Sequence, residues 1–140
     1  MGTSGKYAAI LLLAILLAAC AGDEGGSFSL TTDSGGDRPQ PFPDNYRAEL
    51  LAFMKTYLNN PVGVHDGAMA DPVQRTVGGR ARYVSCLRFT PRESDGSYGV
   101  PRERAIVYVN GRLDRMVEKA GELCAGAAYA PFPDLEKMTR

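Results

Sequence analysis

The strongest constraint on how this chain of 140 residues can fold is an apolar run at residues 8–19. The run carries no charge, and Lys6 precedes it. A membrane-spanning helix needs about 20 apolar residues, so this run is too short to span a bilayer permanently. Its size and basic flank are typical of the hydrophobic region of a secretory signal peptide. We therefore expect residues 1–19 to be removed, which leaves one modest domain rather than two.

The run closes with Leu17, Ala18, Ala19 and Cys20. This motif resembles the lipobox of bacterial lipoproteins, in which small residues suit the protease subsite and the Cys thiol receives diacylglycerol. The alternative is an ordinary signal peptide that ends near a cysteine by chance. The resemblance implies a lipoprotein signal peptide at residues 1–19, cleavage before Cys20, lipidation of Cys20 and a membrane anchor made of lipid. In the usual Gram-negative sorting pattern, Ala21 in place of Asp implies the periplasmic face of the outer membrane.

The segment at residues 20–44 combines the lipidated Cys with acidic residues, Gly, Ser and Pro. Low hydrophobicity with net negative charge does not offset the entropy of ordering, so we predict a disordered tether that is stiffer at the Pro-rich residues 39–43. Residues 45–140 are predicted to form a single periplasmic domain. The formal net charge of the chain is +0. Such a balance gives no global field for nucleic acid, and no nucleic-acid partner is expected.

The hydrophobic pattern of the domain predicts an α+β fold. Apolar residues recur at helical spacing from Tyr46 to Leu58, with Asp44 as the expected N-cap. Residues 82–90, 104–109 and 112–117 alternate as strands, and residues 62–73 form a weaker one that ends at Asp71 and Pro72. Asn110-Gly111 predicts a two-residue hairpin that places Tyr108 opposite Leu113 and Ile106 opposite Arg115. We expect an N-terminal amphipathic helix packed on a small antiparallel sheet of three to four strands, followed by an irregular tail with a short helix after Asp134.

Two cysteines remain once Cys20 is assigned to the lipid, namely Cys86 and Cys124. Exported proteins meet an oxidising compartment, where two leftover cysteines usually pair. We predict one structural disulfide between them. A metal site with His65 is the weaker alternative because its ligands would be widely scattered. A redox-active pair would usually show a Cys-x-x-Cys spacing, which is absent. No metal and no cofactor are expected.

The sequence gives little support for catalysis. His65-Asp66 is the one His–carboxylate pair, and adjacent residues of a strand point to opposite faces. No serine lies in a Gly-x-Ser-x-Gly elbow. We therefore expect that the protein is not an enzyme and has no catalytic residue, with His65 as a polar surface residue.

Arginine is the feature that favours binding. From residue 75 to residue 115 the chain has nine Arg and no Lys, and residues 91–103 form a long polar loop inside this stretch. Arg presents a planar fork that suits carboxylates and phosphates. We expect Arg92 and Arg102 to approach each other at the loop base, with Arg88 and Arg104 close behind and Tyr98 as an aromatic anchor. The alternative is that these Arg residues pair with local acids or are simply solvated.

Three classes of function stay open. The favoured one is a non-catalytic binding or structural module that contacts an envelope protein. The second is a binder of cell-wall or anionic-lipid groups through the Arg-rich loop. The third is a small periplasmic hydrolase or inhibitor.

Overall fold

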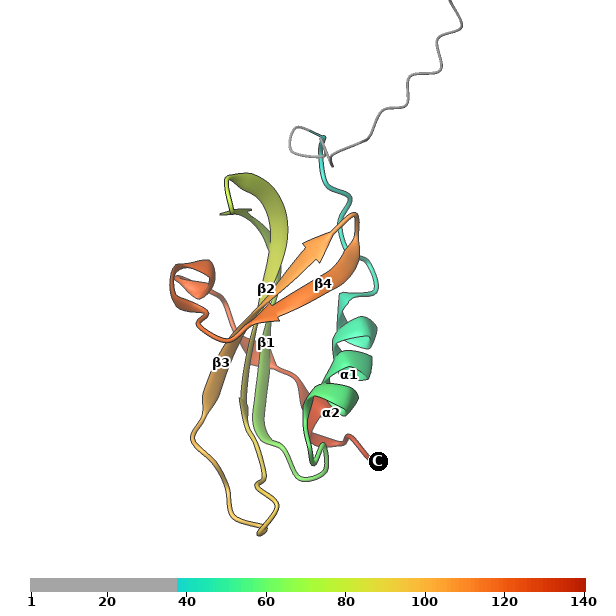
Figure 1. The fold of residues 1–140 in the computed structure, drawn as a ribbon, viewed down its shortest axis with the longest axis vertical. Coiled ribbons are helices and arrows are strands. Elements are labelled where there is room, and N and C mark those ends of the chain that lie inside the picture. Colours follow the sequence, from blue (N-terminus) through green and yellow to red (C-terminus); the bar gives the residue numbers. More distant parts are fainter. Residues whose placement is uncertain (1–37) are drawn as a thin grey trace, which may run out of the picture. The chain divides into compact units, whose positions relative to one another are not determined.

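The computed structural model describes residues 38–140, so the predicted signal peptide, Cys20 and most of the predicted tether lie outside the described residues. The described part is an α+β domain (Figure 1). Its elements in chain order are α1 (Tyr46–Tyr57), β1 (His65–Val77), β2 (Arg80–Thr90), β3 (Arg102–Val109), β4 (Arg112–Val117), the 3₁₀ turn η1 (Gly121–Cys124), β5 (Ala130–Pro131) and α2 (Pro133–Glu136).

The strands form one antiparallel sheet in the order β4-β3-β2-β1-β5. The prediction of three to four strands was too low by one, because β5 is a two-residue strand that pairs with Ala68 and Met69 of β1. β1 also runs past the predicted end at Asp71-Pro72. Its register against β2 shifts between Ala70 and Val73, and one extra residue there lets the strand continue through a proline that has no N–H to donate.

The helix α1 packs on one face of the sheet. Leu50 and Met54 are fully buried, and they join a core cluster with Leu87 and Ile106 of the sheet. Glu49 ties the helix to β4 by accepting a hydrogen bond from the Leu113 amide at 2.7 Å and by pairing with Arg112. The N-cap is Asn45 rather than the predicted Asp44, and it makes no side-chain capping hydrogen bond.

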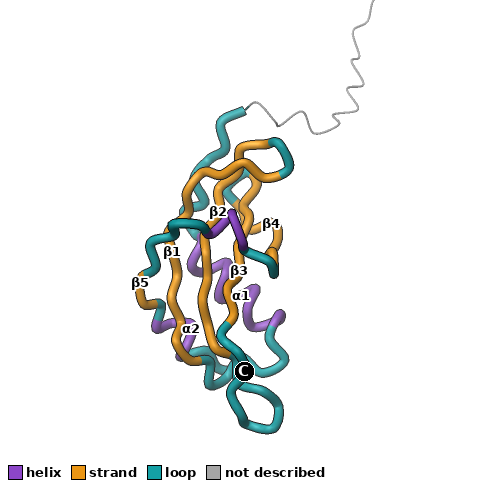
Figure 2. The backbone as a smooth tube through the Cα atoms, turned by 90° about the vertical axis from the view of Figure 1, so that its left-hand side faces the viewer, coloured by secondary structure: helices purple, strands orange, loops and turns teal. Residues whose placement is uncertain are grey.

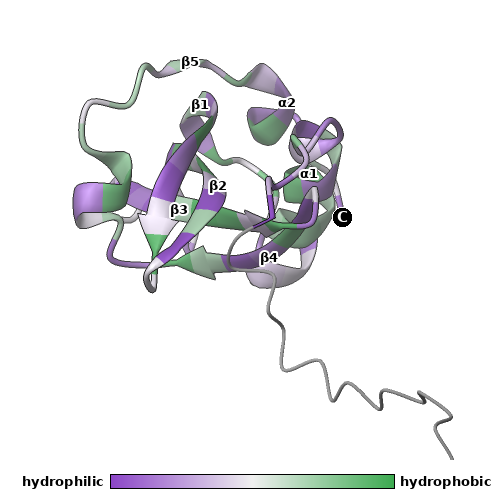
Figure 3. Cartoon of the chain, turned by 90° about the horizontal axis from the view of Figure 1, so that it is seen from above, coloured by the Kyte–Doolittle hydropathy of each residue, from purple (hydrophilic) through white to green (hydrophobic). Residues whose placement is uncertain are grey.

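The tail after β4 covers the opposite face of the sheet, so the sheet lies between two layers (Figure 3). Cys124 of η1 is bonded to Cys86 of β2, with 5.7 Å between the Cα atoms, which confirms the predicted disulfide. The tail then returns to the helix side through β5 and α2. Gly67 is needed at this return, because a Cβ there would lie 2.9 Å from the Phe132 carbonyl oxygen. The Gly67 amide donates to Glu136 of α2 at 2.8 Å.

The hairpin between β3 and β4 has the predicted turn, with positive φ angles of 52° at Asn110 and 75° at Gly111. Tyr108 lies opposite Leu113 as predicted. The predicted pairing of Ile106 with Arg115 was wrong, because a register shift after Val107 places Met116 opposite Ile106. A bulge of this kind offsets every pair beyond it by one residue.

Contacts of the domain reach back before the predicted boundary at residue 44. Gln40 is 8% exposed, and its side-chain oxygen accepts a hydrogen bond from the Asn110 amide at 2.9 Å. The Phe42 ring lies edge-on to the rings of Tyr46 and Tyr83. The described chain therefore enters the domain at the β3–β4 turn.

Candidate functional site

The loop between β2 and β3 is a small ordered hairpin of its own. Arg92 and Tyr98 form a β-bridge, and the Gly99 amide donates to the Pro91 carbonyl at 2.9 Å. At the tip, Asp95 accepts hydrogen bonds from the Ser97 hydroxyl at 2.6 Å and from its amide at 2.9 Å. These hydrogen bonds lower the pKa of the Asp95 carboxyl, since they stabilise its charged form. The loop therefore holds its side chains in fixed places.

Tyr98 fixes the loop to the start of β1. Its ring stacks on His65 with 4.1 Å between the ring centroids, and its hydroxyl lies 2.8 Å from His65 Nε2 in a hydrogen bond. Sequence reasoning treated His65 as an isolated surface residue and missed this contact. Tyr98 is still 46% exposed, and Val100 on the same loop is 79% exposed. The loop thus presents apolar surface to solvent, a feature of protein-binding sites.

Beside the loop lies a cavity of about 400 Å³ with three arginines in its wall. Two of them, Arg92 and Arg102, are the pair that the sequence predicted to approach each other, and the third is Arg140. The full lining is Tyr57, Leu58, Asn59, Asn60, Pro91, Arg92, Glu93, Ser94, Arg102 and Arg140. We call this cavity the arginine pocket. The end of α1, the loop and the last residue of the sequence build it together.

The arginine pocket has an excess of positive charge. Arg102 pairs with Glu93 at 3.6 Å, and both side chains are at least 36% exposed, so this pair contributes under about 1 kcal/mol. Arg92 donates from Nε to the Gly96 carbonyl at 3.3 Å. Its stem passes Gly63, where a Cβ would lie 2.9 Å from Arg92 Cδ. Glu93 is the one acidic side chain in the lining against three arginines.

Arg88 does not lie behind Arg92 and Arg102 as predicted. The register places Arg88 opposite Glu103, one residue out of phase with the pair of Phe89 and Arg102, so Arg88 belongs to the other face of the sheet. Arg88 pairs with Glu103 at 3.0 Å, and its guanidinium lies 3.9 Å above the Tyr129 ring. Arg88 and Arg102 share only the border of a separate hollow that Ala68, Phe89 and Pro101 also line.

Arg104 shares the helix face with Arg102 but does not line the arginine pocket. It donates to the main-chain carbonyls of Glu103 and Glu118 at 3.0 and 3.1 Å. This geometry ties the end of β4 to β3, so Arg104 serves the fold at this position. The lining of the arginine pocket also includes Asn59, Asn60 and Arg140. No local sequence pattern indicated that these three residues belong to a binding site.

Within residues 38–140, no group of three or more His, Cys, Asp or Glu side chains is placed to hold a metal ion. None of the helices in this part of the chain is both long and apolar enough to cross a membrane. No protein-family model matches the chain, and no curated protein and no solved structure matches it either. Its function therefore has to be inferred from its own residues.

Proposed function

We propose that this protein is a lipid-anchored, non-catalytic binding module of the cell envelope that binds a carboxylate-bearing segment of a periplasmic protein. The arginine pocket carries this proposal, because three arginines and one acidic side chain line a cavity of about 400 Å³. The lipid anchor at Cys20 and the outer-membrane location rest on the lipobox resemblance and Ala21.

The chemistry of the pocket suits a carboxylate. A guanidinium offers paired N–H donors that match the two oxygens of a carboxylate, and such charge-assisted hydrogen bonds are roughly twice as strong as neutral ones. The Asn60 side-chain oxygen accepts from the Val62 amide at 3.2 Å, which leaves its NH₂ group as a donor for the ligand. The exposed Tyr98 and Val100 beside the pocket favour a protein partner, since they add apolar contact area.

The arginine pocket lies at the end of the sheet away from the point where the described chain enters the domain. Gln40 is held at the β3–β4 turn, and the loop at residues 91–101 lies at the other end of the sheet (Figure 2). The described residues that precede α1 therefore do not cover the arginine pocket, and none of them is in its lining.

Two neighbouring contacts support the non-catalytic part of the proposal. His65 Nε2 is engaged by the Tyr98 hydroxyl, and the Asp66 carboxylate accepts from the Thr90 hydroxyl at 3.2 Å. Both groups thus hold the loop and strand together rather than pairing with each other as an acid–base unit. Cell-wall peptides also carry carboxylates, so isolated sacculi are a second candidate ligand for the arginine pocket.

We expect capture of the partner to depend on the charges of the pocket. Immobilised mature protein would be exposed to solubilised envelope proteins and, separately, to isolated cell-wall sacculi, with polyglutamate as competitor. Arg102→Gln or Arg140→Gln should weaken retention about 10- to 100-fold, because each removes a hydrogen-bonded charge of roughly 1.5–3 kcal/mol. Arg92 and Tyr98 are spared because they also hold the loop.

Arg115→Gln is the matched control, because Arg115 is an exposed arginine that pairs with Asp114 on β4. It should leave retention unchanged. Retention of sacculi in place of proteins would move the assignment to the cell-wall class. The proposal would be contradicted if retention were unchanged by polyglutamate and by both pocket variants but fell with Arg115→Gln.

A further inference from the structure

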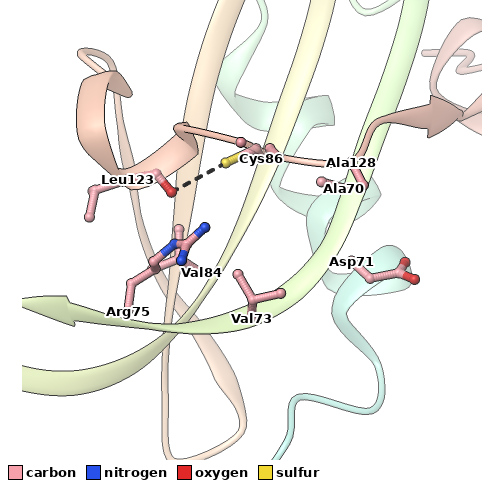
Figure 4. A pocket seen from close by; sticks show the side chains of 10 residues that line it. Ala70, Asp71, Val73, Arg75, Val84, Cys86, Leu123 and Ala128 are labelled. Atoms are coloured by element: carbon pink, nitrogen blue, oxygen red, sulfur yellow. Dashed lines mark hydrogen bonds between the residues drawn. The ribbon is translucent and has the colours of Figure 1, made fainter.

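A second cavity lies on the face of the sheet opposite α1, where η1 and the residues after it cover β1 and β2. Its volume is about 200 Å³ (Figure 4). The walls are mostly small and apolar, and they are formed by Ala70, Asp71, Val73, Arg75, Val84, Cys86, Leu123, Gly126, Ala127 and Ala128. We call this space the disulfide-side cavity. Cys86 Sγ lies 3.8 Å from the Leu123 carbonyl oxygen, a contact rather than a hydrogen bond because a disulfide sulfur has no hydrogen.

One cation reaches this cavity. Figure 4 shows the Arg75 side chain rising from β1 beside Val84 toward the Leu123 segment. Its Nη2 atom donates a hydrogen bond to the Ala125 carbonyl at 3.2 Å. Its Nε is buried and has no hydrogen-bond partner within the described residues. A buried N–H of a guanidinium that lacks an acceptor is costly, so protein groups satisfy the Arg75 guanidinium only in part.

A second arginine raises the local charge. The register places Arg82 of β2 directly opposite Arg75, on the same face. Arg82 is 7% exposed, and its hydrogen bond goes to the carbonyl of its neighbour Ala81 at 3.2 Å. No ion pair joins either arginine to a carboxylate of residues 38–140. Like charges directly opposite on two strands destabilise a sheet, and a bound anion would relieve this repulsion.

The one acidic residue of the lining is already engaged. Asp71 accepts from the Tyr46 hydroxyl at 2.6 Å and pairs with Arg47 at 3.2 Å. Its carboxylate points away from the cavity in Figure 4. It therefore neutralises neither Arg75 nor Arg82.

We propose that the disulfide-side cavity binds a small carboxylate with a short apolar group, its carboxylate on Arg75 and its apolar part against Val73, Val84 and Ala127. The apolar walls suit hydrocarbon, whereas phosphate needs several donors around it and finds one fork here. The volume of about 200 Å³ is below the range typical of drug-sized ligands, so the ligand is short. A free short-chain acid and the C-terminal residue of a peptide share this chemistry.

The test is a titration of nitrogen-15-labelled, detergent-solubilised mature protein, followed by NMR at the amides of Ala70 and Ala127. The probes are butyrate, N-acetyl-alanyl-alanine and the neutral amide of each. Both acids should shift these signals, and the amides should bind about 10- to 100-fold more weakly because they lack the charge that Arg75 binds. Tighter binding of butyrate assigns a free acid as the ligand, and tighter binding of the dipeptide assigns a peptide C-terminus.

Two variants test the site from different sides. Arg75→Gln removes the charge, and Ala127→Leu fills the apolar wall while it leaves Arg75 in place; each should weaken acid binding by about tenfold or more. Arg102→Gln changes the arginine pocket, does not touch the lining of the disulfide-side cavity and should leave acid binding unchanged, which separates this inference from the proposed function. Equal binding of acids and amides, no shift with any probe, or full binding by the folded Ala127→Leu variant would overturn it.

Discussion

Cys124→Ser is expected to lower the free energy of unfolding by about 2–5 kcal/mol, the usual cost of losing a native disulfide from a small exported domain. The bond joins Cys86 to a partner 38 residues later in the chain. In the chain-entropy model, a cross-link that closes a loop of this length lowers the entropy of the unfolded chain and so stabilises the folded state by roughly 4 kcal/mol. The same bond fastens the tail over the second core cluster, where Val84, Ala105 and Val107 are buried.

Chemical denaturation of the two single serine variants measures this effect. Cys86→Ser should destabilise the domain to a similar degree, since each substitution removes the same cross-link. Chemically reduced wild type is the control and should resemble both variants. Alkylation of denatured but unreduced mature protein should label no cysteine at 86 or 124. Full labelling there, or strongly unequal losses in the two variants, would mean that the cysteines act separately.

Cys20→Ala is expected to abolish membrane anchoring. Cys20 lies outside the described residues, and the prediction follows from the lipobox resemblance. Each buried methylene of an acyl chain contributes about 0.8 kcal/mol, so firm anchoring needs two or more chains on the Cys. The variant should stay as an uncleaved precursor or become soluble, whereas the wild type should partition into the detergent phase.

Intact mass and the mature N-terminal residue check this prediction. Inhibition of the lipoprotein signal peptidase with a globomycin-type compound should accumulate precursor. Ala21→Ser is a suitable control, since it leaves the modified cysteine untouched and should remain lipidated. A mature N-terminus at any residue other than Cys20 would show that the lipobox assignment is wrong.

The sequence predicted those parts of the fold that local patterns determine. Helical spacing located α1, because a helix buries every third or fourth residue and Leu50 and Met54 follow that rule. Alternation located β2, β3 and β4, and Asn110-Gly111 supplied the turn. The expectation of export, together with the count of cysteines, predicted the bond between Cys86 and Cys124.

The remaining parts depend on contacts that no local pattern encodes. β5 has two residues, too few for any period, and it exists because Ala130 and Pro131 lie against β1. Pro72 would end most strands, but the extra residue in β1 accommodates it. The sequence of the tail has no periodic pattern from which its course could be predicted. The disulfide and the hydrogen bond from Arg75 to the Ala125 carbonyl, rather than regular secondary structure, hold the tail on the sheet.

The arginine pocket also combines residues that the local sequence pattern predicted with residues that only the fold brings together. Arg92 and Arg102 flank one loop, so a pairing of the two neighbouring strands was enough to predict that they approach each other. Asn60 and Arg140 are distant in the sequence and reach the pocket only through folding. Arg88 lies away from the pocket because side chains alternate between the two faces of a strand, and the register places Arg88 on the face opposite Arg102.

The most direct test of the proposed function is site-specific photo-crosslinking in cells that make the full-length protein. Ser94 is exposed at the rim of the arginine pocket, and Thr76 is exposed near the far end of β1. A photoreactive residue in place of Ser94 should crosslink one periplasmic protein, and Arg102→Gln in the same chain should abolish that product. The same group in place of Thr76 should give none. Crosslinks from Thr76 with none from Ser94, or a Ser94 product that survives Arg102→Gln, would contradict binding at the arginine pocket.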